Sequence, residues 1–184
     1  MPRTSTALRG QILDSALRLF ALHGFRGASL QDIASDAGCS KASLLYHFSN
    51  KEAILAELLI PVGQEAAVLD GRLTDLGGED AARTAVAGFV DLALRYRREL
   101  KVLFDNLSEA TALPGVGVTG IEDRLVDALA GRSTLPQDRV AALMALGGMF
   151  VTATTDVRFE HQVLREAMTS SALRTLGLAQ PIPR

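Results

Sequence analysis

The chain has 184 residues, of which 48% are hydrophobic and 22% are charged, and its formal net charge is −2. This composition is typical of a folded chain of one domain, or of a small domain fused to a larger one, and the single cysteine, Cys39, excludes an internal disulfide and a multi-cysteine zinc site. No run approaches the roughly 20 apolar residues of a membrane helix and the first residues lack an apolar signal-peptide core, so we expect a cytoplasmic protein without a membrane partner.

Almost every segment has apolar residues at helical spacing, and no stretch alternates apolar and polar residues as a strand would. We therefore expect an all-α fold of about nine helices. The first helix is expected over 6–23, because Gly24 can take the left-handed conformation that ends a helix. The second begins after Ser29, whose hydroxyl can cap it while Asp32 reaches back to form a capping box, and it ends at Gly38.

A third helix is expected from Lys41 to about Phe48, with Ser40 as its cap. The same serine-to-acid spacing recurs at Ser49 and Glu52 and predicts the start of a fourth helix, which should bend or restart near Pro61. The remaining helices are expected at 61–73, 79–96, 97–112, 121–130, 136–155 and 160–176.

The segment 115–120 matches the G-x-G-x-x-G pattern of dinucleotide sites, but a helical stretch precedes it where that motif requires a buried strand. No nucleophile with a base, no paired carboxylates and no metal-ligand spacing stand out elsewhere. We therefore expect no cofactor, no metal site, no catalytic residue and no enzymatic activity.

The second and third helices, joined by a tight turn, predict a helix-turn-helix. The capped start of its second helix presents N–H groups and a partial positive charge, and a helix fits the major groove of DNA. There Lys41 can donate to guanine or phosphate, Ser43 can meet either base type, and the methyl of Ala42 suits that of thymine. Lys51 adds a positive charge facing the same backbone. The alternative is a small structural bundle that never touches DNA.

Seven short stretches add to this pattern: Ile12–Leu13, Leu19–Phe20, Gly24–Phe25, Ser29–Ala34, Ala37–Lys41, Leu44–Phe48 and Lys51–Leu55. Together they make residues 9–55 resemble the DNA-binding domain of the TetR family of transcriptional regulators. The resemblance implies base contacts from Gln31, Lys41, Ala42 and Ser43, and phosphate contacts from Ser29, Ser40, Tyr46, His47 and Lys51. Leu45 stands where the family often has tyrosine, while Ser29 and Ser43 keep the hydroxyl of the more frequent threonines.

The resemblance divides the chain into a helix-turn-helix DNA-binding domain at 1–55 and a helical ligand-binding and dimerisation domain at 56–184. The family arrangement implies a homodimer formed through Val140–Thr155 and Glu160–Leu176. The first of these segments is apolar all round, so one face can pack within its own domain while another meets a partner. Two-fold symmetry would place two reading helices about 34–36 Å apart, which predicts a palindromic operator on double-stranded DNA.

Four residues are candidates to line a cavity for a small apolar or amphipathic effector: Phe89, Phe104, Met144 and Phe150. Ordinary core positions are the alternative for each. The function expected from all these features is a sequence-specific DNA-binding transcriptional regulator that acts as a ligand-responsive repressor. The competing expectation is a constitutive DNA-binding protein without a small-molecule effector.

Overall fold

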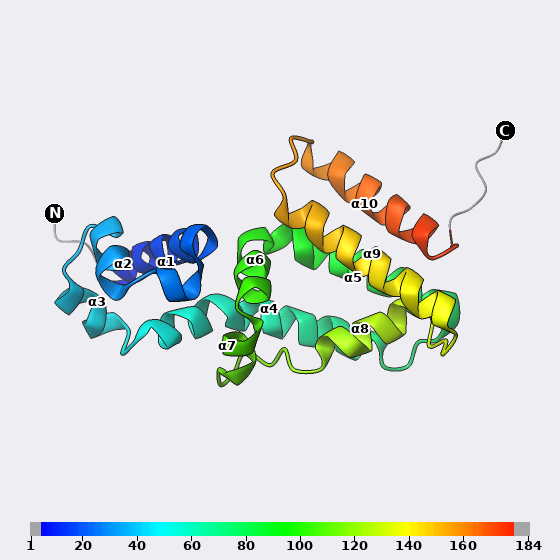
Figure 1. The fold of residues 1–184 in the computed structure, drawn as a ribbon, viewed down its shortest axis with the longest axis horizontal. Coiled ribbons are helices and arrows are strands. Elements are labelled where there is room, and N and C mark those ends of the chain that lie inside the picture. Colours follow the sequence, from blue (N-terminus) through cyan, green and yellow to red (C-terminus); the bar gives the residue numbers. More distant parts are fainter. Residues whose placement is uncertain (1–4, 179–184) are drawn as a thin grey trace. The chain divides into compact units, whose positions relative to one another are not determined.

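The structure is a computed structural model that describes residues 5–178. Within this range the chain forms helices and no strand, which confirms the all-α prediction (Figure 1). The helices are α1 (Ser5–Gly27), α2 (Leu30–Asp36), α3 (Lys41–His47), α4 (Lys51–Leu73), α5 (Gly78–Arg95), α6 (Arg97–Asp105), α7 (Leu107–Ala112), α8 (Ile121–Leu129), α9 (Pro136–Thr154) and α10 (His161–Thr175). None of these helices combines the length and apolarity that a bilayer crossing requires.

The local signals at the first three helices are confirmed. The helical backbone of α1 is interrupted at Gly24, where φ is +72°. Ser29 caps α2, and both halves of its capping box with Asp32 are formed. Ser40 caps α3 by accepting the backbone N–H of Ser43 at 3.0 Å.

The predicted start of α4 is wrong by one residue. Asn50 caps this helix, because its side-chain oxygen accepts the backbone N–H of Ala53 at 2.7 Å, so Ser49 and Glu52 do not form the expected capping box. The expected break near Pro61 is also absent, since this residue lies inside a helix that continues to Leu73. The two segments predicted on either side of Pro61 are one helix.

The single helix predicted over 97–112 is two helices, separated at Asn106. This asparagine is buried, its amide nitrogen donates to the carbonyl oxygen of Val102 at 2.8 Å, and its oxygen accepts the N–H of Phe25 at 3.3 Å. A side chain that bonds to the preceding turn and to a distant segment competes with regular helix geometry. The interruption therefore depends on a contact 81 residues away in the sequence.

The chain forms two compact units. Unit 1 comprises Met1–Gly63 and Arg98–Gly117, and unit 2 comprises Gln64–Arg97 and Val118–Arg184. The helix α4 begins in unit 1 and ends in unit 2. The functional division at residue 55 stays a prediction.

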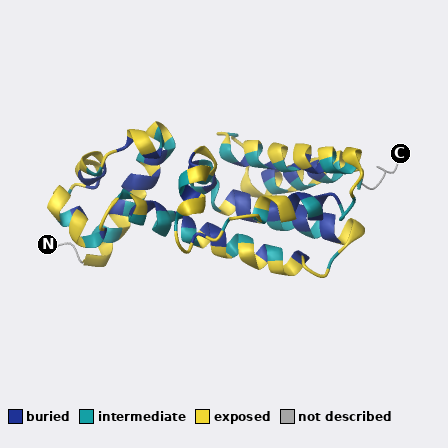
Figure 2. Cartoon of the chain, turned by 60° about the horizontal axis from the view of Figure 1, so that its bottom comes forward, coloured by how far each residue is buried: buried dark blue, intermediate teal, exposed yellow. Residues whose placement is uncertain are grey.

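The core of unit 1 is formed by the inner faces of its first helices. Ile12 and Phe20 on α1, Ile33 on α2 and Leu44 on α3 are all completely buried, and Phe48 directly after α3 is nearly so. Figure 2 shows this separation of buried and exposed faces along the helices. Each short helix is therefore held mainly by one or two apolar side chains, and its remaining residues are left at the surface.

In unit 2, α5 and α9 each contact both α8 and α10. α5 supplies much of the buried surface, including Val86, Phe89 and Val90. The glycine-rich segment 115–120 lies between α7 and α8, and no strand precedes it, so its context is that of a loop between helices.

Candidate nucleic-acid interface

The helix α3 turns most of its side chains outward. Within the helix Leu44 is buried, and Phe48 after it is buried as well. The other predicted contact residues on this helix are exposed or half-buried: Lys41, Ala42, Ser43, Tyr46 and His47. Tyr46 is 83% exposed, and its ring meets that of His47 edge to face with 5.4 Å between centres. An exposed tyrosine beside a half-buried histidine contributes little to folding and places two hydrogen-bonding groups at the surface.

The N-terminal end of α3 leaves hydrogen-bonding groups at the surface. The hydroxyl oxygen of Ser40 accepts the N–H of Ser43, which leaves the hydroxyl hydrogen of Ser40 to donate outward. Lys41 is the first residue of the helix and is exposed. Small side chains at Ala42 and Ser43 let the backbone approach a partner closely.

At the start of α2, the polar side chains already form hydrogen bonds with one another and with the backbone of the helix. The hydroxyl of Ser29 accepts the N–H of Asp32 at 3.1 Å and donates to the Asp32 carboxylate at 2.6 Å. The hydroxyl and the backbone N–H of Ser29 both hold the pKa of Asp32 below its ordinary value. Gln31 is exposed, and its amide nitrogen donates to the hydroxyl oxygen of Ser35 at 3.3 Å. The hydroxyl hydrogen of Ser29 already donates to the Asp32 carboxylate, and the phosphate contact of this serine stays a prediction.

Lys51 is tied to the turn between α1 and α2. Its ammonium donates to the carbonyl oxygen of Phe25 and, at 2.8 Å, to that of Ala28. The same nitrogen lies 4.4 Å from the centre of the Phe25 ring. An ammonium has three N–H donors, so two hold this turn against the start of α4, and the phosphate contact expected from the third stays a prediction.

The segment after Gly24 is also held by Asn106, which lies between α6 and α7, and by α7. Asn106 accepts the N–H of Phe25, and Arg26 pairs with Glu109 at 2.7 Å. The hydroxyl of Ser108, followed by the Arg26 guanidinium, lowers the pKa of Glu109. These contacts fix the turn that precedes α2.

Two residues that shape this surface were missed by sequence reasoning, Arg9 and Asn106. Arg9 donates to the last residue of α3 and pairs with Glu57 on α4, and Asn106 holds Phe25. Each contact joins residues at least 38 positions apart. No local sequence signal marks such pairs.

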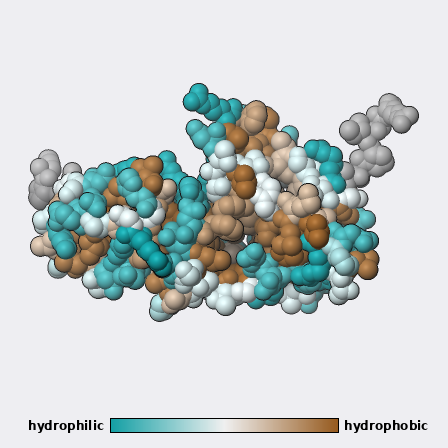
Figure 3. Space-filling view, viewed as in Figure 1, coloured by the Kyte–Doolittle hydropathy of each residue, from teal (hydrophilic) through white to brown (hydrophobic). Residues whose placement is uncertain are grey.

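A second surface lies along α9. From Val140 onward its exposed residues form one uncharged stripe at helical spacing: Val140, Leu143, Met144, Gly147, Gly148 and Val151. Figure 3 shows hydrophobic and pale atoms over this part of the molecule. A Cβ added at Gly147 or Gly148 would meet nothing within 4 Å, so the backbone is open to close approach there.

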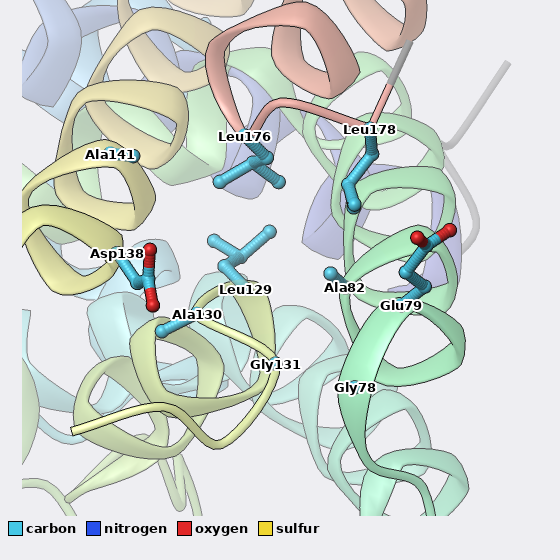
Figure 4. A pocket seen from close by; sticks show the side chains of 10 residues that line it. All are labelled: Gly78, Glu79, Ala82, Leu129, Ala130, Gly131, Asp138, Ala141, Leu176 and Leu178. Carbon is cyan, nitrogen blue, oxygen red and sulfur yellow. The ribbon is translucent and has the colours of Figure 1, made fainter. Parts of the chain in front are cut away.

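Unit 2 also contains a cavity of about 210 Å³. It is lined by Gly78, Glu79, Ala82, Leu129, Ala130, Gly131, Asp138, Ala141, Leu176 and Leu178. Figure 4 shows leucine side chains pointing toward one another in its middle and the carboxylates of Glu79 and Asp138 on opposite sides.

None of the four predicted effector residues lines this cavity. Phe89 is buried and Phe150 half-buried, while Phe104 and Met144 are exposed. Their role in binding an effector stays a prediction. Among residues 5–178, no three histidine, cysteine or acidic side chains lie together as metal ligands would.

Comparison with known proteins agrees with this geometry. Residues 12–58 match the family model "Bacterial regulatory proteins, tetR family". The HTH-type transcriptional repressor KstR2 of Mycobacterium tuberculosis is 43% identical over 51 residues, 28% of this chain and 26% of that protein. The HTH-type transcriptional regulator RutR of Escherichia coli is 44% identical over 57 residues, 31% of this chain and 27% of that protein. The match therefore spans about a quarter of the length of these curated relatives.

The likeness of the whole chain is one of fold. The solved structure of the ketosteroid transcriptional regulator KstR2 of Mycobacterium tuberculosis superposes with a TM-score of 0.68 at 19% identity, over 92% of this chain and 93% of that chain. These relatives are described as transcriptional regulators. Residues 12–58 are thus similar to the N-terminal domain of the tetR family of bacterial regulatory proteins, and the fold of the chain is similar to that of TetR-like regulators.

Proposed function

We propose that this chain is a sequence-specific DNA-binding transcriptional regulator that reads the major groove with α3. The observation that carries the proposal is the outward row of polar side chains on a short capped helix whose apolar residues are already buried. Base contacts are assigned to Gln31, Lys41, Ala42 and Ser43, and phosphate contacts to Ser29, Ser40, Tyr46, His47 and Lys51. A helix of this kind fits the major groove, and phosphate contacts on either side set its register.

Selection of duplexes from a random pool by the purified protein tests this proposal directly. One enriched sequence is expected, and Lys41→Ala should weaken its binding by about 1–3 kcal/mol while relaxing the preference at one base pair. The matched control is Lys101→Ala on α6, which removes the same charge from a residue paired with Asp105. If both variants lose base-pair preference equally, or if no sequence is enriched, the base contact assigned to Lys41 would be contradicted.

We further propose that the regulator is a homodimer joined through the α9 stripe together with α10. Support comes from the stripe itself, because a solvent-facing side of a helix normally carries charged residues and this one carries none. Two copies related by a two-fold axis would present two α3 helices about 34–36 Å apart, one turn of B-DNA. The enriched sequence should therefore be a palindrome whose half-sites have this spacing.

Repression and control by a small apolar or amphipathic effector complete the proposal. The relative KstR2 is described as a transcriptional repressor. The cavity in unit 2, at about 210 Å³, is smaller than the roughly 300–1,000 Å³ of most ligand pockets, so it suits a small molecule. Because α4 is continuous from unit 1 into unit 2, a ligand that shifts this helix would act on the support of α3.

Thermal unfolding in the presence of candidate metabolites separates this proposal from the constitutive alternative. A ligand that raises the melting temperature and changes affinity for the selected duplex supports the effector-responsive regulator. A coupling of about 1–3 kcal/mol would change DNA affinity roughly 5- to 150-fold. Intact DNA binding with no melting shift across a broad metabolite panel favours the constitutive protein.

A further inference from the structure

The guanidinium of Arg9 joins three helices of unit 1 at the C-terminal end of α3. Its Nη1 donates to the carbonyl oxygen of His47 at 3.0 Å, and its Nε donates to Oε1 of Glu57 at 3.0 Å. Its Nη2 pairs with the other carboxylate oxygen of Glu57. The carbon Cζ of Arg9 lies 4.4 Å from the centre of the Phe48 ring. One side chain of α1 therefore ties the last residue of α3 to α4.

The helix α3 depends on such contacts because it is short. Seven residues do not form a stable helix alone, and the last carbonyl groups of any helix lack partners within it. Ser40 satisfies the N-terminal end, Leu44 anchors the middle, and Arg9 satisfies the carbonyl group of His47 at the C-terminal end.

We infer that Arg9 is a positioning residue for DNA reading, a role that rests on the proposed DNA binding. It sets the direction of α3, and through it the placement of Tyr46 and His47. Its charge is neutralised by the forked pair with Glu57, so it is not used as a phosphate anchor. A direct phosphate contact would require Arg9 to leave that carboxylate.

Two substitutions, measured by their effect on DNA affinity, distinguish a positioning role of Arg9 from a role as a phosphate anchor. Arg9→Lys keeps the charge but lacks the planar fork that reaches both Glu57 and the carbonyl oxygen of His47. A positioning role predicts at least about a tenfold loss of affinity for the duplex selected by the wild-type protein, with an unchanged salt slope. Glu57→Gln weakens the hold on Arg9 and should also reduce affinity. An anchoring role predicts that lysine retains most of the affinity and that Glu57→Gln tightens binding, because it removes a competing negative charge.

The control is Arg124→Lys on α8, whose partner Asp70 lies in the part of α4 that belongs to unit 2, and it should leave the affinity unchanged. Affinities are measured by fluorescence anisotropy at several salt concentrations, at a temperature where circular dichroism shows every variant fully folded. Should Arg9→Lys fold poorly, Glu57→Gln alone decides between the two roles, because positioning predicts weaker DNA binding and anchoring predicts tighter DNA binding. Unchanged affinity in both variants, or the anchoring pattern, overturns the inference while leaving the proposed function intact. A wild-type protein that enriches no duplex overturns both.

Discussion

Truncation of Met144 on α9 should weaken the proposed dimer. Met144 is 66% exposed in the single chain and belongs to the uncharged stripe. Burying a whole methionine side chain stabilises by about 1.5–3 kcal/mol, so about two thirds of this, roughly 1–2 kcal/mol, is available at an interface. A two-fold interface contains the residue twice, which gives about 2–4 kcal/mol per dimer. Met144→Ala should therefore raise the dimer dissociation constant roughly 30- to 1,000-fold.

Sedimentation equilibrium over a range of protein concentrations measures this constant. Val68→Ala is the matched control, because Val68 is 56% exposed in unit 2 but lies on α4. It should leave the dissociation constant unchanged. The reasoning is refuted if Met144→Ala dimerises as tightly as the wild type, or if the control weakens the dimer equally. In either case the α9 stripe would not be the interface.

Three further substitutions test the support of the DNA-binding surface. Gly63→Ala would place its Cβ 1.6 Å from the carbonyl oxygen of Val116, so the backbone must move and thermal unfolding should show a loss of at least about 1–3 kcal/mol. Lys51→Ala should lower the melting temperature through the lost carbonyl contacts and flatten the salt slope of DNA binding by about 0.9 through one lost phosphate contact. Asp32→Asn should reduce the acid sensitivity of folding. Because hydrogen bonds from Ser29 lower the pKa of Asp32 in the folded state, its charged form contributes stability above its ordinary pKa of 3.8, and that contribution disappears as the pH falls below this value.

Each of these has a control in the same unit. Gly10→Ala meets no atom within 4 Å and should stabilise α1 by about 0.5–1 kcal/mol, so equal destabilisation by both glycine variants would contradict the steric argument. Lys101→Ala should leave the salt slope unchanged, and an unchanged slope for Lys51→Ala would restrict Lys51 to a structural role. Asp14→Asn removes a carboxylate of α1 without breaking the α2 capping box. The same change in acid sensitivity in both aspartate variants would rule out the capping box as its source.

The exposure of the residues proposed to contact DNA could be predicted because the signals that place them are local. Ser29 and Ser40 cap helices through atoms three residues away, and the spacing of Leu44 and Phe48 decides which side of α3 faces inward. The same local reasoning failed at Ser49, where the neighbouring Asn50 provides the cap instead. Either of two adjacent residues can cap a helix, and the backbone conformation before α4 determines which of them does.

The sequence by itself determined the helical fold, the positions of most helix ends and which side of α3 faces outward. These follow from hydrophobic spacing and capping, which act over a few residues. Only the tertiary structure decided that Asn106 interrupts a helix, that two donors of Lys51 are used by carbonyl groups and that Arg9 holds the end of α3. It also decided which side of α9 stays exposed, since a helix that is apolar all round does not mark its outer face. Such contacts join residues that are distant in sequence, and they exist only once the helices have packed.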